Sequence, residues 1–217
     1  MGSTSRDFAS DDIFNSVHID LLTNQAQQKS EFTEQLITSR QNISAKRLVE
    51  PGPNPYQLLQ AFKAAAAAPD HGLITPWRFV IVPSAARAKL GEAFALALID
   101  RDPGATLEQI EMAREKAQRA PCLILAIARL GSCEPPIPVL ERMVSVGAAI
   151  QNILLTANGQ GFGSSLASGQ ALSSQRITNF FGIEEGESGI CFINIGTVSK
   201  CRSPRRRPEI DTFVSSL

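Results

Sequence analysis

The run from Cys122 to Leu130 is the sequence feature that most limits how this chain can fold. It reads Cys-Leu-Ile-Leu-Ala-Ile-Ala-Arg-Leu, so that apart from Arg129 successive residues are apolar whichever side of a strand they face. Apolar residues on both faces are typical of a strand that is covered on both sides. The run is far shorter than the ~18 apolar residues of a membrane span. It therefore predicts a sheet in the middle of the molecule with other elements packed against both faces.

The rest of the chain is expected to form enough helices to cover both faces of this sheet. Residues 139–160 are apolar nearly all round a helix, which is typical of a central core helix or a dimer seam. Asn54 before Pro55, and Thr106 with Gln109, are helix-start patterns. Ser84 is expected to cap a further helix. The full expectation is helices at about 31–39, 55–68, 84–98, 106–119 and 139–160, a short one ending at 181, and strands at 77–82, 122–130 and 190–197.

The sequence predicts an α+β sandwich, with a small antiparallel or mixed sheet flanked by helices. The 217 residues show no internal repeat and suit one domain with an added arm. Residues 1–30 are polar and only weakly periodic, and within them Ile13–Leu22 is expected to form a short helix or strand, or else to belong to a tail without structure. We therefore expect an N-terminal arm at 1–32 and the folded domain at 33–217.

Composition narrows the class of protein. The formal net charge is zero, which argues against a nucleic-acid partner. The N-terminus lacks the apolar stretch of a secretory signal, so no membrane association and a cytoplasmic location are expected. The four cysteines, Cys122, Cys133, Cys191 and Cys201, include no Cys-x-x-Cys pair. Reduced, mostly buried thiols are the preferred interpretation, with a zinc site or a disulfide as the alternatives.

Few side chains offer acid–base or nucleophilic chemistry. The chain has only two histidines, and one of them, His71, lies in the loop between the helix at 55–68 and the strand at 77–82. A histidine in such a loop is either structural or a ligand contact, because loops at strand ends present polar groups from a rigid support. No cluster of carboxylates and histidines suggests a metal. A bound cofactor that carries the chemistry is consistent with this shortage.

Two basic features could hold a phosphate. Arg40 is either a solvated helix end or, with Asn42 beside it, a phosphate clamp. The tail residues Arg202, Arg205, Arg206 and Arg207 form a run that could be solvated, bind nucleic acid or close over a bound phosphate. The glycines at 159, 161 and 163 follow a long helix, so we interpret them as a turn and not as a dinucleotide fingerprint.

Taken in order, these segments resemble the nitroreductase family, in particular its small single-domain branch. The resemblance covers roughly residues 33–217 and depends on an ordered set of short motifs. They are Arg40-Gln41-Asn42, Arg47-Leu48, Glu50-Pro51-Gly52-Pro53, Ala68-Pro69-Asp70-His71, Pro76-Trp77-Arg78-Phe79, Gly147-Ala148-Ala149 with Gln151-Asn152, Gly161-Phe162-Gly163, Ile195-Gly196-Thr197, and Arg205 and Arg207 before Pro208.

The resemblance implies an FMN-dependent enzyme whose fold is an α+β homodimer, with flavin at the subunit interface and residues 139–160 suited to the seam. It implies no catalytic side chain, since the flavin carries the chemistry. The cofactor-binding residues would be Arg40, Gln41, Asn42, His71, Leu166, Ala167, Ser168, Arg205 and Arg207. The nicotinamide would lie near Thr156, Ala157, Asn158, Gly159, Gln160 and Gly161. The sequence departs from the family pattern at Gln41, Asn42, Ala67, Leu166 and Ala167.

Three functions follow as hypotheses. The first is an NAD(P)H-dependent flavin oxidoreductase that passes hydride through flavin N5 to a nitroaromatic, a quinone or a similar small acceptor; a variant uses oxygen, as an oxidase or a flavin-degrading enzyme. The second is a non-catalytic flavin-binding homodimer. The third is a nucleic-acid or partner-binding module that uses the tail at 200–207, which the neutral charge disfavours.

Overall fold

The computed structural model describes the backbone of residues 8–200, 203 and 206–217, and the side chains of those from residue 24 onward. The chain forms two compact units, and the boundary between them lies between Arg40 and Gln41. In the first unit, helix α1 (Phe8–Ser39) runs without a break through the expected boundary between residues 32 and 33. The second unit, Gln41–Leu217, contains every strand among the described residues.

The helices and strands of the second unit follow the expected order closely. The α-helices are α2 (Pro55–Ala66), α3 (Ser84–Arg101), α4 (Leu107–Glu115), α5 (Val139–Gly159) and α6 (Gln175–Phe181). The short 3-10 helices are η1 (Ala45–Arg47), η2 (His71–Leu73), η3 (Lys116–Gln118), η4 (Gln170–Ser173) and η5 (Ile210–Thr212). The strands are β1 (Leu48–Val49), β2 (Trp77–Ile81), β3 (Cys122–Arg129), β4 (Gly163–Ala167) and β5 (Glu187–Val198).

Strand β5 organises the sheet. The strand order is β1-β5-β3-β2, and β4 also pairs with β5. Every pairing between these strands is antiparallel, with Ile124 opposite Ile193 in the β3–β5 ladder. The sequence analysis interpreted the glycines around 163 as a turn and did not predict β4, because a short Ser-rich segment has no strand pattern of its own and pairs only where β5 offers an edge.

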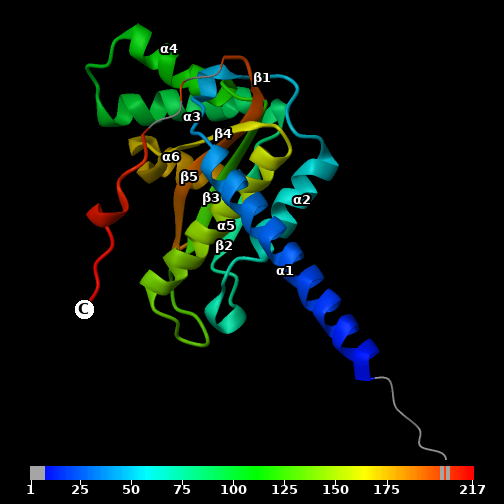
Figure 1. Cartoon of the computed structure of the whole chain (residues 1–217). Coiled ribbons are helices and arrows are strands. Elements are labelled where there is room, and N and C mark those ends of the chain that lie inside the picture. Colours follow the sequence, from blue (N-terminus) through cyan, green and yellow to red (C-terminus); the bar gives the residue numbers. More distant parts are fainter. Residues whose placement is uncertain (1–7, 201–202, 204–205) are drawn as a thin grey trace, which may run out of the picture. The chain divides into compact units, whose positions relative to one another are not determined.

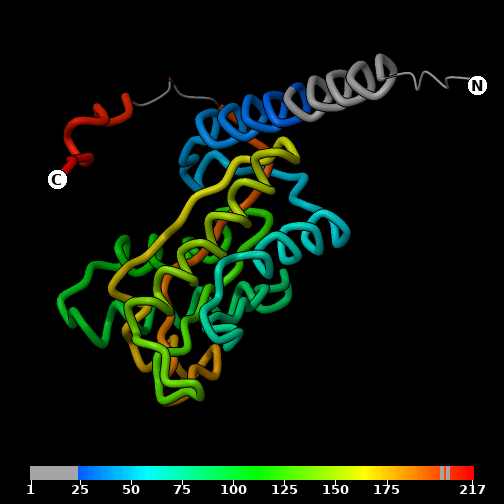
Figure 2. Tube along the Cα trace, turned by 60° about the horizontal axis from the view of Figure 1, so that its bottom comes forward, coloured from blue at the N-terminus to red at the C-terminus, as the bar shows by residue number. Residues whose placement is uncertain are grey.

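The sheet is covered on both faces, as the run at 122–130 predicted. Alternate residues of β3 enter two different cores. Ile124 and Ala126 pack with α2 and α5, whereas Leu123 and Leu125 pack with α3 and α6. Figure 1 shows the sheet between these helices, and Figure 2 shows α2 and α5 side by side over one face. The α+β sandwich is therefore confirmed.

The helix ends show which local signals were reliable. Asn54 and Thr106 each form a capping box, with Gln57 and Gln109 respectively. Ser84, in contrast, is the first residue of α3 and not its cap; Pro83 occupies the cap position and makes no side-chain hydrogen bond there. The expected helix at 106–119 consists of α4 followed by η3.

Helix α5 is the one described helix long and apolar enough to be considered a membrane span, by length and composition alone. Its buried residues, which include Val146, Ala149 and Ile153, pack into the core with α2 and the sheet. This packing accounts for the apolar residues on the buried face of α5, whereas Leu140 and Val144 are exposed.

A half-buried ion pair holds β2 to the start of β5, and we expect it to make stability depend on acid. Arg78 donates from Nε and Nη2 to the two carboxylate oxygens of Glu187, at 2.8 and 2.7 Å. These bonds lower the pKa of Glu187 from its usual 4.5. Below that value the unfolded chain binds more protons than the folded one, so the pair's contribution is lost as pH falls through the folded pKa.

The variant Glu187→Gln should therefore unfold more easily than the wild type at pH 7, by about 1–3 kcal/mol, and by a smaller margin at pH 3.5. Urea unfolding curves at the two pH values test this. A margin that stays equal or grows at pH 3.5 contradicts the assignment.

Candidate functional site

A large cavity lies between helices α3 and α4 and one face of the sheet. Its volume is about 560 Å³, within the range of ~300–1,000 Å³ that is usual for small-molecule sites. Strands β3, β4 and β5 and the segment through η4 form its other walls, and Ala45 of η1 closes one side.

Apolar side chains form most of the inner surface of this cavity. Phe94 of α3 and Phe192 of β5 lie edge to face, with ring centroids 5.5 Å apart. Leu98, Leu123 and Leu172 complete the apolar part. Because Phe192, Leu123 and Leu125 face the same side of the sheet, β-strand alternation aims this surface at the cavity. A slot of this kind suits a flat, apolar ring system.

Three cationic side chains line the same cavity: Arg101, Lys116 and Arg119. Burial lowers the pKa of Lys116 from its usual value, and the charges of Arg119 and Arg101 lower it further. Asp102 also lines the cavity, and its Oδ1 accepts a hydrogen bond from the backbone N–H of Gly104. The cavity is therefore apolar inside and positively charged at one wall, a combination that favours a planar ligand with negative charge.

A buried arginine positions the segment that carries Lys116. Arg87 of α3 is 5 % exposed and donates to the carbonyl oxygens of Val82, Ala117, Ala120 and Pro121 at 2.7–3.2 Å. Three of these carbonyls belong to the segment between α4 and β3. Arg87 therefore fixes η3, and Lys116 with it, against the body of the unit.

Of the ring-binding residues expected from the sequence, the structure brings Ala167 and Ser168 to this cavity. Ala167 pairs with Phe192, so both face the same side of the sheet. Leu166 pairs with Ile193 and faces the opposite core, with 44 % of its surface exposed. Ala167 and Ser168 thus line the cavity, whereas the side chain of Leu166 lies on the other face of the sheet.

The segment expected to hold a phosphate runs past the start of β4. Asn42 forms an isolated bridge with Ser164, and the N–H of Ile43 donates to the carbonyl of Ser164 at 2.9 Å. This segment leads directly to Ala45 at the cavity wall. Gln41 precedes Asn42 in this segment, and Arg40 belongs to the first unit. Of the two tail arginines expected at the phosphate, Arg205 lies outside the described residues and Arg207 is exposed.

His71 and the expected nicotinamide segment do not line this cavity within one chain. His71 Nδ1 lies 2.7 Å from a carboxylate oxygen of Glu141, in the first turn of α5. Residues 156–161 form the opposite end of α5, where Gln160 donates to the carbonyl of Gln57 at 3.1 Å. Both groups are attached to the helix that covers the other face of the sheet.

Several residues that line the cavity were not predicted from the sequence. Lys116 and Arg119 belong to the short segment Lys116-Ala117-Gln118-Arg119 that precedes the strand beginning at Cys122. Two basic residues at the end of a helix are usually solvated, so the sequence did not single them out. Asn194 is the only amide within the apolar run at 190–195, and that isolation was a usable signal. Phe94 lies in an alanine-rich helix whose pattern does not indicate which face is buried.

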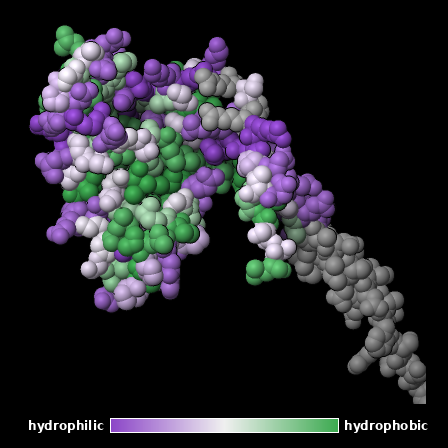
Figure 3. Space-filling model, turned by 90° about the vertical axis from the view of Figure 1, so that its left-hand side faces the viewer, coloured by the Kyte–Doolittle hydropathy of each residue, from purple (hydrophilic) through white to green (hydrophobic). Residues whose placement is uncertain are grey.

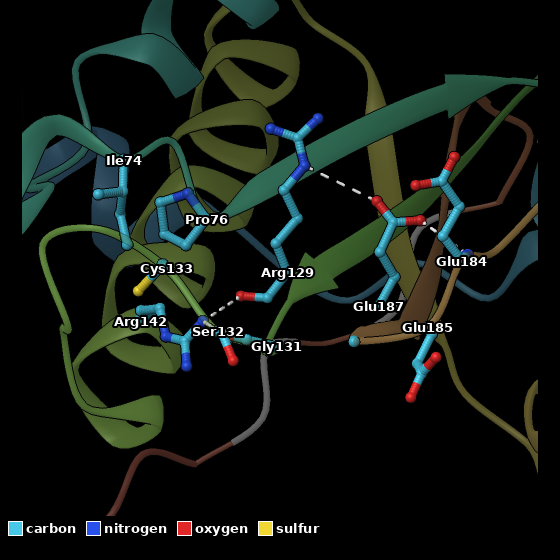
Figure 4. A pocket seen from close by; sticks show the side chains of 11 residues that line it. Ile74, Pro76, Arg129, Gly131, Ser132, Cys133, Arg142, Glu184, Glu185 and Glu187 are labelled. Atoms are coloured by element: carbon cyan, nitrogen blue, oxygen red, sulfur yellow. Dashed lines mark hydrogen bonds and ion pairs between the residues drawn. The ribbon is translucent and has the colours of Figure 1, made fainter.

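A second cavity, drawn in Figure 4, has a different character. Its volume is about 280 Å³, and it is lined by Arg129 and Arg142 together with Glu184, Glu185 and Glu187. Arg142 donates to the carbonyl oxygens of Arg129, Leu130 and Gly131 and so ties the start of α5 to the end of β3. The three carboxylates make this smaller cavity unfavourable for an anion.

Comparison with known proteins identifies the family of the chain. The family model described as "Nitroreductase family" matches residues 45–197. A Haemophilus influenzae protein named "Putative NAD(P)H nitroreductase" is 33 % identical over 184 residues, which are 84 % of this chain and 97 % of that protein.

Two solved structures share the fold at low identity. The nitroreductase-like family protein from Bacillus cereus has a TM-score of 0.73 at 17 % identity, covering 84 % of this chain and 94 % of its own. The FMN-dependent nitroreductase NfnB from Mycobacterium smegmatis, solved in complex with NADPH, has a TM-score of 0.68 at 15 % identity, covering 87 % and 99 %. With the family model matching well over half of its length, the chain belongs to the nitroreductase family.

Proposed function

We propose that this protein is an FMN-dependent oxidoreductase that takes electrons from NAD(P)H and passes them to a small acceptor such as a nitroaromatic compound or a quinone. The observation that carries the proposal is the 560 Å³ cavity, which combines an apolar slot with a cationic wall. Flavin mononucleotide has the matching shape and charge, with a flat ring system and a phosphate. The relative from Mycobacterium smegmatis is FMN-dependent by its description and was solved with NADPH.

The residues present fit this cofactor. Phe94, Leu98 and Phe192 offer the apolar surface for the ring, with Ala167 and Ser168 at its edge. The segment of Gln41 and Asn42 offers amide donors at the side of Ala45. In the proposal, Arg40, Arg205 and Arg207 add charge at the phosphate, as the family resemblance implies.

Lys116 has the most direct influence on the chemistry. When bound, FMN supplies the redox step, accepting a hydride from NAD(P)H and passing the electrons on. A lysine cation beside the ring system favours the gain of electrons there, because opposite charges attract, and since Lys116 is exposed in the single chain, solvent weakens this effect. Lys116 can thus supply a positive charge at the ring.

A homodimer would complete the site. Leu140 and Val144 of α5 are 80 % and 71 % exposed, and Figure 3 shows apolar side chains gathered into continuous areas on one face of the second unit. Two such units that bury apolar surface together could bring His71 and residues 156–161 of one subunit towards the cavity of the other. We propose this arrangement for the flavin and nicotinamide contacts. The free Cys122, Cys133 and Cys191 suit the reducing cytoplasm.

The visible absorption spectrum of the purified protein tests the proposal. Added FMN should give a protein that stays yellow after gel filtration, and NADPH or NADH under nitrogen should bleach it. A nitroaromatic or a quinone should then restore the colour faster than oxygen does. Faster recovery with oxygen supports the oxidase, and colour that NAD(P)H never bleaches supports the non-catalytic binding protein. A protein that takes up no flavin contradicts the proposal as a whole.

A further inference from the structure

One residue of the cavity has no explanation in the fold itself. Asn194 lies in the middle of β5 and is 3 % exposed, yet its Nδ2 has no hydrogen-bond partner among the described residues. Its neighbours on the same face of the sheet, Leu123 and Phe192, are apolar. A buried amide donor without a partner destabilises a protein, so its presence in a native structure requires an explanation, of which a bound ligand is one. Asn194 also lines the 560 Å³ cavity.

The strand register places Asn194 between the two ends of the proposed flavin site. Asn194 pairs with Ser165, the residue after Ser164, and Ser164 is the partner of Asn42 in the phosphate-binding segment. Phe192 lies two residues before Asn194 on β5, so its side chain is on the same face of the sheet, about 7 Å from that of Asn194. A flavin with its phosphate near Asn42 and its ring against Phe192 can therefore lay the chain that joins them across Ser165 and its partner Asn194.

We propose that Asn194 binds the polyol chain of the flavin, with Nδ2 donating a hydrogen bond to one of its hydroxyl groups. This inference rests on the proposed function, because it takes the cavity as the flavin site. It adds a cofactor-binding residue within the apolar strand and gives the unpartnered amide a ligand. It also predicts a compromise: the amide destabilises the protein without cofactor and strengthens binding once the cofactor is present.

The variant Asn194→Leu separates these two effects, since leucine has nearly the same size and shape but no donor. Without flavin, the variant should unfold at a temperature equal to or higher than that of the wild type, because no unpartnered amide remains buried. With flavin, its dissociation constants for FMN and for riboflavin should both rise about tenfold. Lumiflavin, which has the ring but no polyol chain, should bind both proteins equally well.

Fluorescence titration with the three flavins and thermal unfolding of the flavin-free proteins provide these readouts. The matched control is Asn179→Leu in α6, an exposed asparagine whose side chain bonds to Gln175 and does not line the cavity. It should leave the affinity for all three flavins unchanged.

Each outcome has a distinct meaning. If the wild type binds none of the flavins, the proposed function fails and Asn194 fails with it. If the wild type binds FMN and Asn194→Leu binds it equally well, only the inference about Asn194 fails. A variant that unfolds more easily without flavin and loses lumiflavin as well shows a structural role and overturns the inference. A loss for FMN that riboflavin does not share assigns Asn194 to the phosphate and also overturns it.

Discussion

Replacing Arg87 by alanine is expected to lower the free energy of unfolding by about 3–5 kcal/mol, the range typical of breaking a buried charge network. The guanidinium of Arg87 is the hydrogen-bond donor for four carbonyl oxygens that the fold buries or half-buries. Alanine removes all four bonds and leaves the carbonyls without this donor. Urea unfolding followed by circular dichroism measures the loss.

Two further variants give this prediction its controls. Arg87→Lys keeps the positive charge, but a single ammonium group cannot reach carbonyls spread from Val82 to Pro121, so an intermediate loss is expected. Arg114→Ala removes an arginine of α4 that pairs with Glu92 and Glu111 on the surface, and it should change stability far less. If Arg87→Ala costs no more than Arg114→Ala, the structural role assigned to Arg87 is wrong.

Replacing Lys116 by glutamine is expected to weaken FMN binding by about 10- to 100-fold, the effect of losing a hydrogen bond or contact that involves a charge. Lys116 lines the cavity, and its ammonium group is partly removed from water. The reduction potential of bound FMN should also fall, because a cation beside the ring favours electron gain. Fluorescence titration and a redox titration against a reference dye measure the two quantities.

The stability of the flavin-free protein distinguishes binding from folding. Burial and the nearby Arg119 and Arg101 lower the pKa of Lys116, which means that its charge is unfavourable in the empty cavity. Removing that charge should leave the flavin-free protein as stable as the wild type or more so. The matched control is Lys89→Gln, an exposed lysine of α3 that does not line the cavity. Equal FMN affinity in the Lys116 and Lys89 variants would contradict the assignment.

Much of the fold could be predicted from local patterns. The capping boxes at Asn54 and Thr106 act within a single turn, so the residues that decide them are adjacent in the sequence. The unbroken apolar run of β3 required cover on both faces, and both cores are present. The apolar length of α5 likewise predicted a helix that packs against the sheet. The ordered motifs predicted the nitroreductase family, which the family model confirms over residues 45–197.

The candidate site was predicted only in part, for a physical reason. Ala167 and Ser168 were expected at the ring and do line the cavity, yet Leu166 beside them faces the other core. In a strand the face of each residue depends on the register with its partner, and β4 takes its register from β5 some thirty residues further along the chain.

The sequence by itself determined most of the helices, the central strands and the family, because spacing, capping and ordered motifs are local properties. Only the tertiary structure decided where the cavity lies and what lines it. Lys116 and Asn194 come from separate elements that resemble an ordinary helix end and an ordinary core strand in the sequence. They line the same cavity because β5 pairs with β3 and β4, and because Arg87 holds η3 against α3. Such contacts depend on residues distant in the sequence, so no local pattern records them.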